Sequence, residues 1–142
     1  MEPRIFATFD WAVPEEEIAS TDVEAVPPGK EIMEGIRSAL INRGFNVSAL
    51  YQHDSYGWCF DTQIGDVSVW SMIQLSDSWL IISDAPVSWL QKLRGRSNAP
   101  ALSEMSKAIH GCLLEQPLAR SIQWFSHKEF LDKKGIGGAN EP

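Results

Sequence analysis

The chain has 142 residues, of which 44% are hydrophobic and 22% charged, and its formal net charge at pH 7 is −7. This length predicts one domain spanning 1–142, and the composition excludes a wholly disordered chain and a collagen-like one. No apolar run approaches the roughly 18 residues that a membrane-spanning helix needs. Two cysteines are too few for a disulfide scaffold. Because the first residues also lack the features of a signal peptide, we expect a cytoplasmic protein.

The negative charge is concentrated near the start of the chain. Residues 1–29 hold seven acidic residues and one basic residue, which gives −6, whereas residues 30–142 hold twelve and eleven, which gives −1. Such an acidic N-terminal segment repels nucleic acid and anionic membranes and attracts basic partners. Glu15, Glu16 and Glu17 form its densest run and are candidate partner-binding residues. The alternative is a solvated surface loop. A calcium-binding loop is not expected, because ligands at alternating positions and a sharp glycine turn are missing.

The first predicted elements are a short strand over 4–9, a proline-containing loop over 12–29 and a helix over 30–43. Ile32, Ile36 and Leu40 recur on one face of this helix with a 3.6-residue period. Gly44 follows at the position where a helix commonly ends in a left-handed residue.

Four strand candidates rich in β-branched and aromatic residues follow, over 45–51, 56–64, 67–75 and 78–84. Gly65-Asp66 is a strong signal for a two-residue hairpin turn, and Ser76-Asp77 is a weaker one. The last three strands are therefore predicted to form an antiparallel meander.

The remaining predicted elements are a short helix over 85–94, a helix over 101–115, a strand over 119–125, one or two helical turns from His127, and a flexible tail over 135–142. Pro117 prevents the second long helix from continuing. Strands clustered in the middle of the chain, with helices before and after, indicate an α+β fold. We predict a single antiparallel sheet with helices 30–43 and 101–115 packed on one face.

The two hairpin turns predict which side chains share a face of the sheet. If each turn has two residues, Phe60 lies opposite Ser71 and Ile73 lies opposite Leu80, and directly opposed side chains point to the same face. The face predicted to lie beneath the helices then holds Tyr56, Trp58, Phe60, Ile64, Val67, Val69, Ile73, Leu75, Leu80 and Ile82.

The opposite face of the predicted sheet is unusually apolar for a surface that contacts water. It holds Asp61, Trp70, Met72, Trp79 and Ile81, which are our further candidate partner-binding residues. Three covers for this face remain open: residues 1–29 folding back over it, a second copy of the chain, or a different partner. Only the last two covers make the face a functional site.

The sequence contains no short catalytic or nucleotide-binding motif, so we expect no catalytic residue, no cofactor and no metal site. His53 and Asp54 are adjacent, and a histidine with an orienting carboxylate can act as a base. They define the alternative of a small-molecule-binding protein or small enzyme. The basic residues Lys92, Arg94 and Arg96 are too few for a nucleic-acid surface, and we expect no membrane partner.

One family resemblance rests on segments within residues 30–126: Arg43-Gly44-Phe45, Tyr56-Gly57-Trp58-Cys59-Phe60, Trp79-Leu80-Ile81-Ile82, the helix over 101–115 and Ile122-Gln123-Trp124-Phe125. Their order resembles small cytoplasmic α+β proteins of bacteria, some of which are similar to immunity proteins that neutralise toxins. The resemblance implies a non-enzymatic protein that occludes a partner, and the acidic N-terminal segment would suit a basic one. In size and charge the chain also resembles the acidic chaperones of bacterial secretion systems, which implies a homodimer as the alternative.

Overall fold

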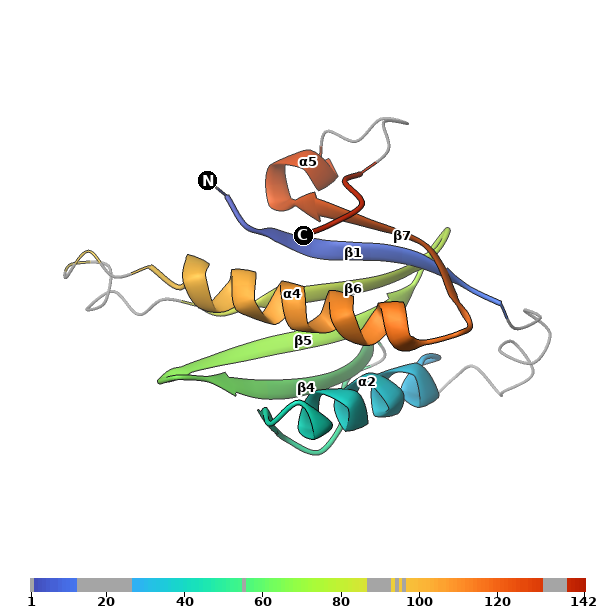
Figure 1. Cartoon of the computed structure of the whole chain (residues 1–142), viewed down its shortest axis with the longest axis horizontal. Helices are drawn as coiled ribbons and strands as arrows, with labels where there is room; N and C mark the ends of the chain where they lie inside the picture. The colour runs from blue at the N-terminus through green and yellow to red at the C-terminus, as the bar shows by residue number, and fades with distance from the viewer. Residues whose placement is uncertain are drawn as a thin grey trace.

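The computed structural model describes residues 2–12, 27–54, 56–86, 93, 95, 97–131 and 138–142. Within these residues the protein is an α+β fold with one open antiparallel sheet of seven strands and three helices (Figure 1). The strands are β1 (Arg4–Trp11), β2 (Asn46–Val47), β3 (Tyr51–His53), β4 (Gly57–Ile64), β5 (Val67–Leu75), β6 (Trp79–Asp84) and β7 (Ala119–Ser126). The helices are α2 (Lys30–Asn42), α4 (Ala99–Glu115) and α5 (His127–Leu131). The predicted fold class is therefore confirmed.

The sheet runs in the order β2-β4-β5-β6-β1-β7, and β3 pairs with β4. β1 lies between β6 and β7 and is antiparallel to both. The predicted cover by residues 1–29 is therefore wrong for residues 4–11. These residues form an interior strand instead of folding back over a face of the sheet. The reason is that β1 is apolar on both sides: Phe9 is buried in the main core, and Phe6 is buried on the other face.

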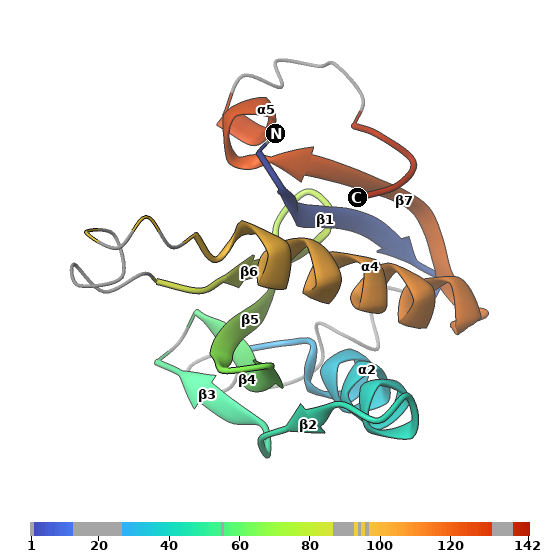
Figure 2. The ribbon, with the colours of Figure 1, turned by 60° about the vertical axis from the view of Figure 1, so that its left-hand side comes forward.

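Helices α2 and α4 lie side by side on one face of the sheet, as predicted (Figure 2). Helix α2 buries its apolar stripe, which consists of Ile32, Met33, Ile36 and Leu40. Helix α4 buries Ala101, Leu102, Met105, Ser106, Ile109, Cys112 and Leu113. These side chains meet those of the sheet in the main hydrophobic core.

The turn between β4 and β5 has the predicted two residues. Phe60 lies opposite Ser71 and Trp58 opposite Ile73. Gly65 has a φ of 63°, which the first position of a tight hairpin turn of this kind requires and which glycine adopts without strain.

The turn between β5 and β6 is longer than predicted, and the predicted register of β6 is therefore wrong by one residue. Leu75 pairs with Trp79, so Ser76, Asp77 and Ser78 all lie in the turn. None of the three has a positive φ, although the favoured two-residue hairpin turns need one. The Ser76 amide instead donates to the carbonyl oxygen of Ser78, at 3.0 Å.

This one-residue shift exchanges the two faces of β6, because successive side chains of a strand alternate. Trp79 and Ile81 are buried in the main core beneath the helices, whereas Leu80 and Ile82 belong to a separate cluster on the other face. At the strand ends, Tyr56 and Leu75 are 60% and 44% exposed, so they do not belong to the predicted buried face.

The strand predicted over 45–51 is interrupted, which leaves β2 and β3 as two short strands. Ser48 lies between them and binds Asp61 of β4 twice. Its amide donates to the Asp61 carbonyl oxygen at 2.8 Å, and its Oγ accepts from the Asp61 amide at 2.9 Å. This side-chain bond replaces regular strand pairing at that point.

The predicted flexible tail is docked where the structure describes it. Ala139 pairs with Trp124 of β7 through two backbone hydrogen bonds of 2.7 and 2.9 Å. Gly138 permits this approach, since a Cβ there would lie 2.8 Å from Trp124 and Phe125 atoms. Most of the helix predicted over 85–94, and the basic residues Lys92, Arg94 and Arg96, lie outside the described residues.

Candidate functional site

We call the sheet face opposite α2 and α4 the open face. A row of side chains crosses it over six strands, because each member lies opposite the next. From β3 to β7 the row consists of Tyr51, Cys59, Met72, Ile82, Phe6 and Phe125. The open face is therefore apolar along its middle, as the sequence predicted in general, although with different residues from β6.

Helix α5 closes the β1–β7 end of the open face. It packs on β1 and β7, and its Phe130 stacks on Phe6 with ring centroids 4.6 Å apart. Phe130 also meets Phe125 edge-on at 5.8 Å. Phe6, Phe125 and Leu80 form the second buried cluster, and Phe130 packs against it, so this half of the face is core and not a free surface.

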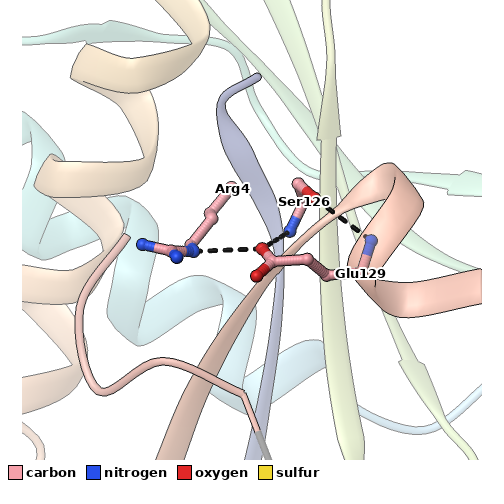
Figure 3. Close-up of polar contacts among 3 residues, drawn as sticks. All are labelled: Arg4, Ser126 and Glu129. Carbon is pink, nitrogen blue, oxygen red and sulfur yellow. Dashed lines mark hydrogen bonds and ion pairs between the residues drawn. The ribbon is translucent and has the colours of Figure 1, made fainter. Parts of the chain in front are cut away.

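Helix α5 is fixed in place by reciprocal hydrogen bonds at its first turn (Figure 3). The Ser126 amide donates to Glu129 Oε1 at 2.9 Å, and the Glu129 amide donates to Ser126 Oγ at 3.1 Å. This is a capping box. Arg4 Nε donates to the same Glu129 oxygen at 3.1 Å, which connects the helix to β1.

A surface pocket of about 380 Å³ lies at this corner and is lined by residues that include Arg4, Ser103, Ser126 and Glu129. The amide of Ser126, and then Arg4, lower the pKa of the Glu129 carboxyl below its ordinary value. A carboxylate that is already bound in this way and has a lowered pKa is a poor general base. We therefore assign this corner a structural role.

The rest of the open face, on β3, β4, β5 and the Asp84 end of β6, is different, because no described helix packs on it. We call its exposed and half-exposed polar and aromatic side chains the acidic aromatic surface, which consists of Tyr51, His53, Asp61, Trp70 and Asp84. Tyr51 is 38% exposed, and Trp70 is half-buried. The His53 ring meets the Trp70 ring edge-on with centroids 6.0 Å apart.

One row of the acidic aromatic surface places a tryptophan between two carboxylates. Trp70 of β5 lies opposite Asp61 of β4 on one side and opposite Asp84 of β6 on the other. Opposed side chains share a face, so all three belong to the open face. The backbones of Asp61 and Asp84 thus lie about one strand spacing, roughly 4.8 Å, from that of Trp70. The Trp70 ring itself approaches His53 of β3, and Asp84 Oδ1 accepts from the Ala85 amide at 2.8 Å.

Tyr51 holds the Asp61 carboxylate in position, since its hydroxyl donates to Asp61 Oδ1 at 2.9 Å. Burial, and then this hydrogen bond, raise the pKa of Tyr51 above its ordinary value. The phenol therefore stays protonated and remains a donor at physiological pH. Burial likewise raises the pKa of the Cys59 thiol beneath, although a hydrogen bond from the Trp70 side chain acts in the opposite direction.

The segment of chain that carries this surface contributes charge of one sign, whereas Arg37 of α2 reaches the sheet edge and donates to the Ser48 carbonyl oxygen at 2.6 Å. Residues 44–86, which form β2 to β6 and their turns, contain five aspartates and no lysine or arginine. The ion pairs between described residues, Arg4–Glu129 and Arg43–Glu115, both lie elsewhere. Asp61 and Asp84 thus have no cationic partner among the described residues.

The sequence-predicted partner-binding residues are only partly brought together. Asp61, Trp70 and Met72 lie on the open face, with Met72 only 7% exposed beneath the surface. Trp79 and Ile81 lie on the opposite face because of the register shift, buried in the main core. The remaining candidates, Glu15, Glu16 and Glu17, lie outside the described residues.

The alternative site at His53 and Asp54 lies at the end of β3. Both residues are exposed, and Asp54 adopts a φ of 49° in the turn. His53 contacts the rings of Tyr56 and Trp70. Across the described part of the chain, no group of three or more His, Cys, Asp or Glu residues is placed to hold a metal ion.

Comparisons with protein-family models, with curated proteins and with solved structures gave no match for this chain. None of the described helices combines the length and the apolar character that crossing a membrane requires. Any statement about function therefore rests on the geometry and charge of the molecule itself.

Sequence reasoning missed two members of the acidic aromatic surface, Tyr51 and Asp84, and it named His53 only for the alternative small-molecule site. The absence of lysine and arginine over residues 44–86 could have indicated the acidic character of this surface. The Ser126-x-x-Glu129 pattern likewise signals the capping box that fixes α5. The pairing of Asp84 with Trp70 depends on the three-residue turn and could not be read from the sequence.

We expect the Glu129→Gln variant to be less stable than the wild-type protein at neutral pH, with the difference lost in acid. Because the folded protein lowers the pKa of Glu129, its ionised form stabilises the fold above the pKa of the unfolded chain, roughly 4.3. This contribution disappears as the pH falls through the lower folded-state pKa. Urea unfolding at pH 7 and pH 3 measures the effect. Glu104→Gln, at an exposed position of α4, is the control, and an equal response of both variants would contradict the assignment.

Proposed function

We propose that the protein is a non-enzymatic, cytoplasmic protein-binding module that binds and occludes a basic protein partner, in the manner of an immunity or inhibitor protein. The acidic aromatic surface is the binding surface in this proposal. The observation that carries it is an aromatic and acidic sheet face on which no described helix packs, in a segment with five aspartates and no lysine or arginine.

The chemistry of this surface supports protein recognition. Tyrosine and tryptophan supply large, rigid contact areas and are enriched at the centres of interfaces. A patch of single-sign charge accelerates association with an oppositely charged partner and excludes partners of like charge. The two free cysteines are both buried, which is compatible with a reducing compartment.

A homodimer is the second candidate, and the same surface argues against it. Two copies that meet through this face would bring the carboxylates of Asp61 and Asp84 toward those of a second copy. Like charges in juxtaposition oppose association. A small-molecule site near His53 and Asp54 has less support, since both side chains are exposed at a strand end.

Site-specific photo-crosslinking in the native cells tests the proposal. A photoreactive phenylalanine derivative replaces Gln63, which lies on β4 two residues from Asp61 on the same face. The matched control replaces Glu104, an exposed residue of α4. We expect position 63, and not position 104, to crosslink to a different, basic protein, whose activity the purified protein then inhibits.

Two results would overturn this function. Crosslinking of position 63 only to a second copy of the chain, with light scattering showing a dimer, would favour the chaperone-like homodimer. Equal crosslinking from both positions, or none from position 63, would show that the acidic aromatic surface is not an interface.

A further inference from the structure

A hydrogen bond between two side chains connects helix α4 to strand β7. Trp124 of β7 is 1% exposed, and its indole Nε1 donates to Nδ1 of the half-buried His110 on α4 at 3.0 Å. The two rings meet edge-on with centroids 6.0 Å apart. Because Nδ1 accepts this bond, it carries no proton, and the single proton of the neutral imidazole is on Nε2.

Trp124 also connects β7 to residues 138–142. Its backbone pairs with Ala139 through two hydrogen bonds, and Pro142 lines the corner pocket together with Ser103 of α4. The segment therefore extends from β7 toward the N-terminal turns of α4. Trp124 thus contacts α4 through its indole and this segment through its backbone.

We propose that His110 is an acid-sensitive latch: its neutral form holds Trp124 against α4, and its protonation frees the indole and loosens the pairing of β7 with residues 138–142. Protonated imidazole donates from both ring nitrogens, so rotation of the ring cannot restore an acceptor. The indole N–H would then be a buried donor without a partner, which is costly in the folded state. Conformations in which Trp124 leaves its buried position are therefore favoured at low pH.

Charged groups of both signs lie on the elements around this contact. They include Lys107 and Glu115 of α4, Arg43 of α2, Arg4 and Asp10 of β1, Arg120 of β7 and Glu141 of the last segment. Arg43 pairs with Glu115, Arg4 pairs with Glu129, and Asp10 lies opposite Arg120. Lys107 is one helical turn before His110, and its like charge opposes protonation of the imidazole.

The pH range of the latch follows from the chemistry of histidine. Aspartate and glutamate ordinarily titrate below about pH 5, and lysine and arginine above about pH 10. Histidine ordinarily changes its charge between about pH 5 and 8. The bond between Trp124 and His110 therefore contributes stability at neutral pH, and this contribution is lost as the pH falls through the histidine range.

Hydrogen exchange of the full chain, followed by nuclear magnetic resonance at pH 7 and pH 5.5, tests the latch. We expect the protection of the Trp124 indole and of the Ala139 amide, each corrected for its intrinsic exchange rate, to fall about tenfold on acidification, the scale of one unsatisfied buried donor. His110→Asn places an amide oxygen at the position of Nδ1 and does not titrate. Its protection is expected to stay nearly constant.

The matched controls are His53→Asn and His127→Asn, which replace the other two histidines at exposed positions. Both are expected to show the same fall in protection as the wild-type protein. A fall of equal size in His110→Asn would refute the latch. An Ala139 amide that keeps its protection while the indole loses it would refute the loosening of residues 138–142.

Removal of the donor provides the second readout. Trp124→Phe keeps an aromatic ring but has no N–H, so protonation of His110 no longer breaks a bond. In urea unfolding at the same two pH values, we expect the folding equilibrium constant of the wild-type protein to fall about tenfold more on acidification than that of this variant. An equal fall in both proteins would contradict the proposal.

Discussion

Replacing Trp79 with alanine is expected to lower the free energy of unfolding by about 3–5 kcal/mol, the range for truncating a large buried aromatic residue. Trp79 is only 4% exposed and belongs to the main core beneath α2 and α4. The loss combines the transfer free energy of the indole with the cavity that it leaves. Equilibrium urea unfolding, followed by circular dichroism, measures the change.

The matched control for this substitution is Trp70→Ala, since Trp70 is half-buried on the open face. We expect it to destabilise the protein clearly less than Trp79→Ala and to act mainly on partner binding. If the two variants lose equal stability, the two tryptophans do not lie on opposite faces, and the pairing of Leu75 with Trp79 is incorrect.

Replacing Gly57 with alanine is the second change with a large expected effect. A Cβ at this position would lie 2.1 Å from the carbonyl oxygen of Ile73 and 3.0 Å from Met72 Cγ. The first of these atoms belongs to the backbone of β5, an interior strand that cannot yield without disturbing its own pairing. We expect a loss at or above the upper end of about 1–3 kcal/mol, the usual range for overpacking.

Gly35→Ala is the matched control for Gly57→Ala, and its expected effect has the opposite sign. The nearest atom to a Cβ at Gly35 is Gln116 Nε2 at 3.6 Å, an ordinary contact. Gly35 lies within α2, where alanine is favoured over glycine by roughly 0.5–1 kcal/mol. Thermal and urea unfolding of both variants would show one stabilised and one destabilised protein. A destabilised Gly35→Ala would mean that α2 packs more tightly against Gln116 than this distance indicates.

The main helices and strands could be predicted because their signals are local. The apolar period of α2, the alternation in β4 and the Gly65 turn each depend on a few neighbouring residues. The β5–β6 turn could not be assigned in this way, since Ser76, Asp77 and Ser78 permit turns of two or three residues. One residue there decides the direction of every side chain in β6.

The same uncertainty explains why the candidate site was predicted only in part. Residues that precede the β5–β6 turn, such as Asp61 and Trp70, were placed on the correct face. Trp79 and Ile81 follow it and were placed on the wrong one. The sequence also could not predict what covers the open face. That depends on β1 pairing with β6 and β7, which lie far from it along the chain.

The pairing of Ala139 with Trp124 has a consequence for self-association. A sheet edge with free amide and carbonyl groups is a template on which another strand can add. On β7, the Trp124 amide and carbonyl are bound by Ala139, and the Ser126 amide is bound by the Glu129 carboxylate. Copies of this protein are therefore prevented from joining edge to edge along that part of β7. Loss of residues 138–142 would expose this part of β7. We expect a chain shortened in this way to form fibrillar aggregates slowly.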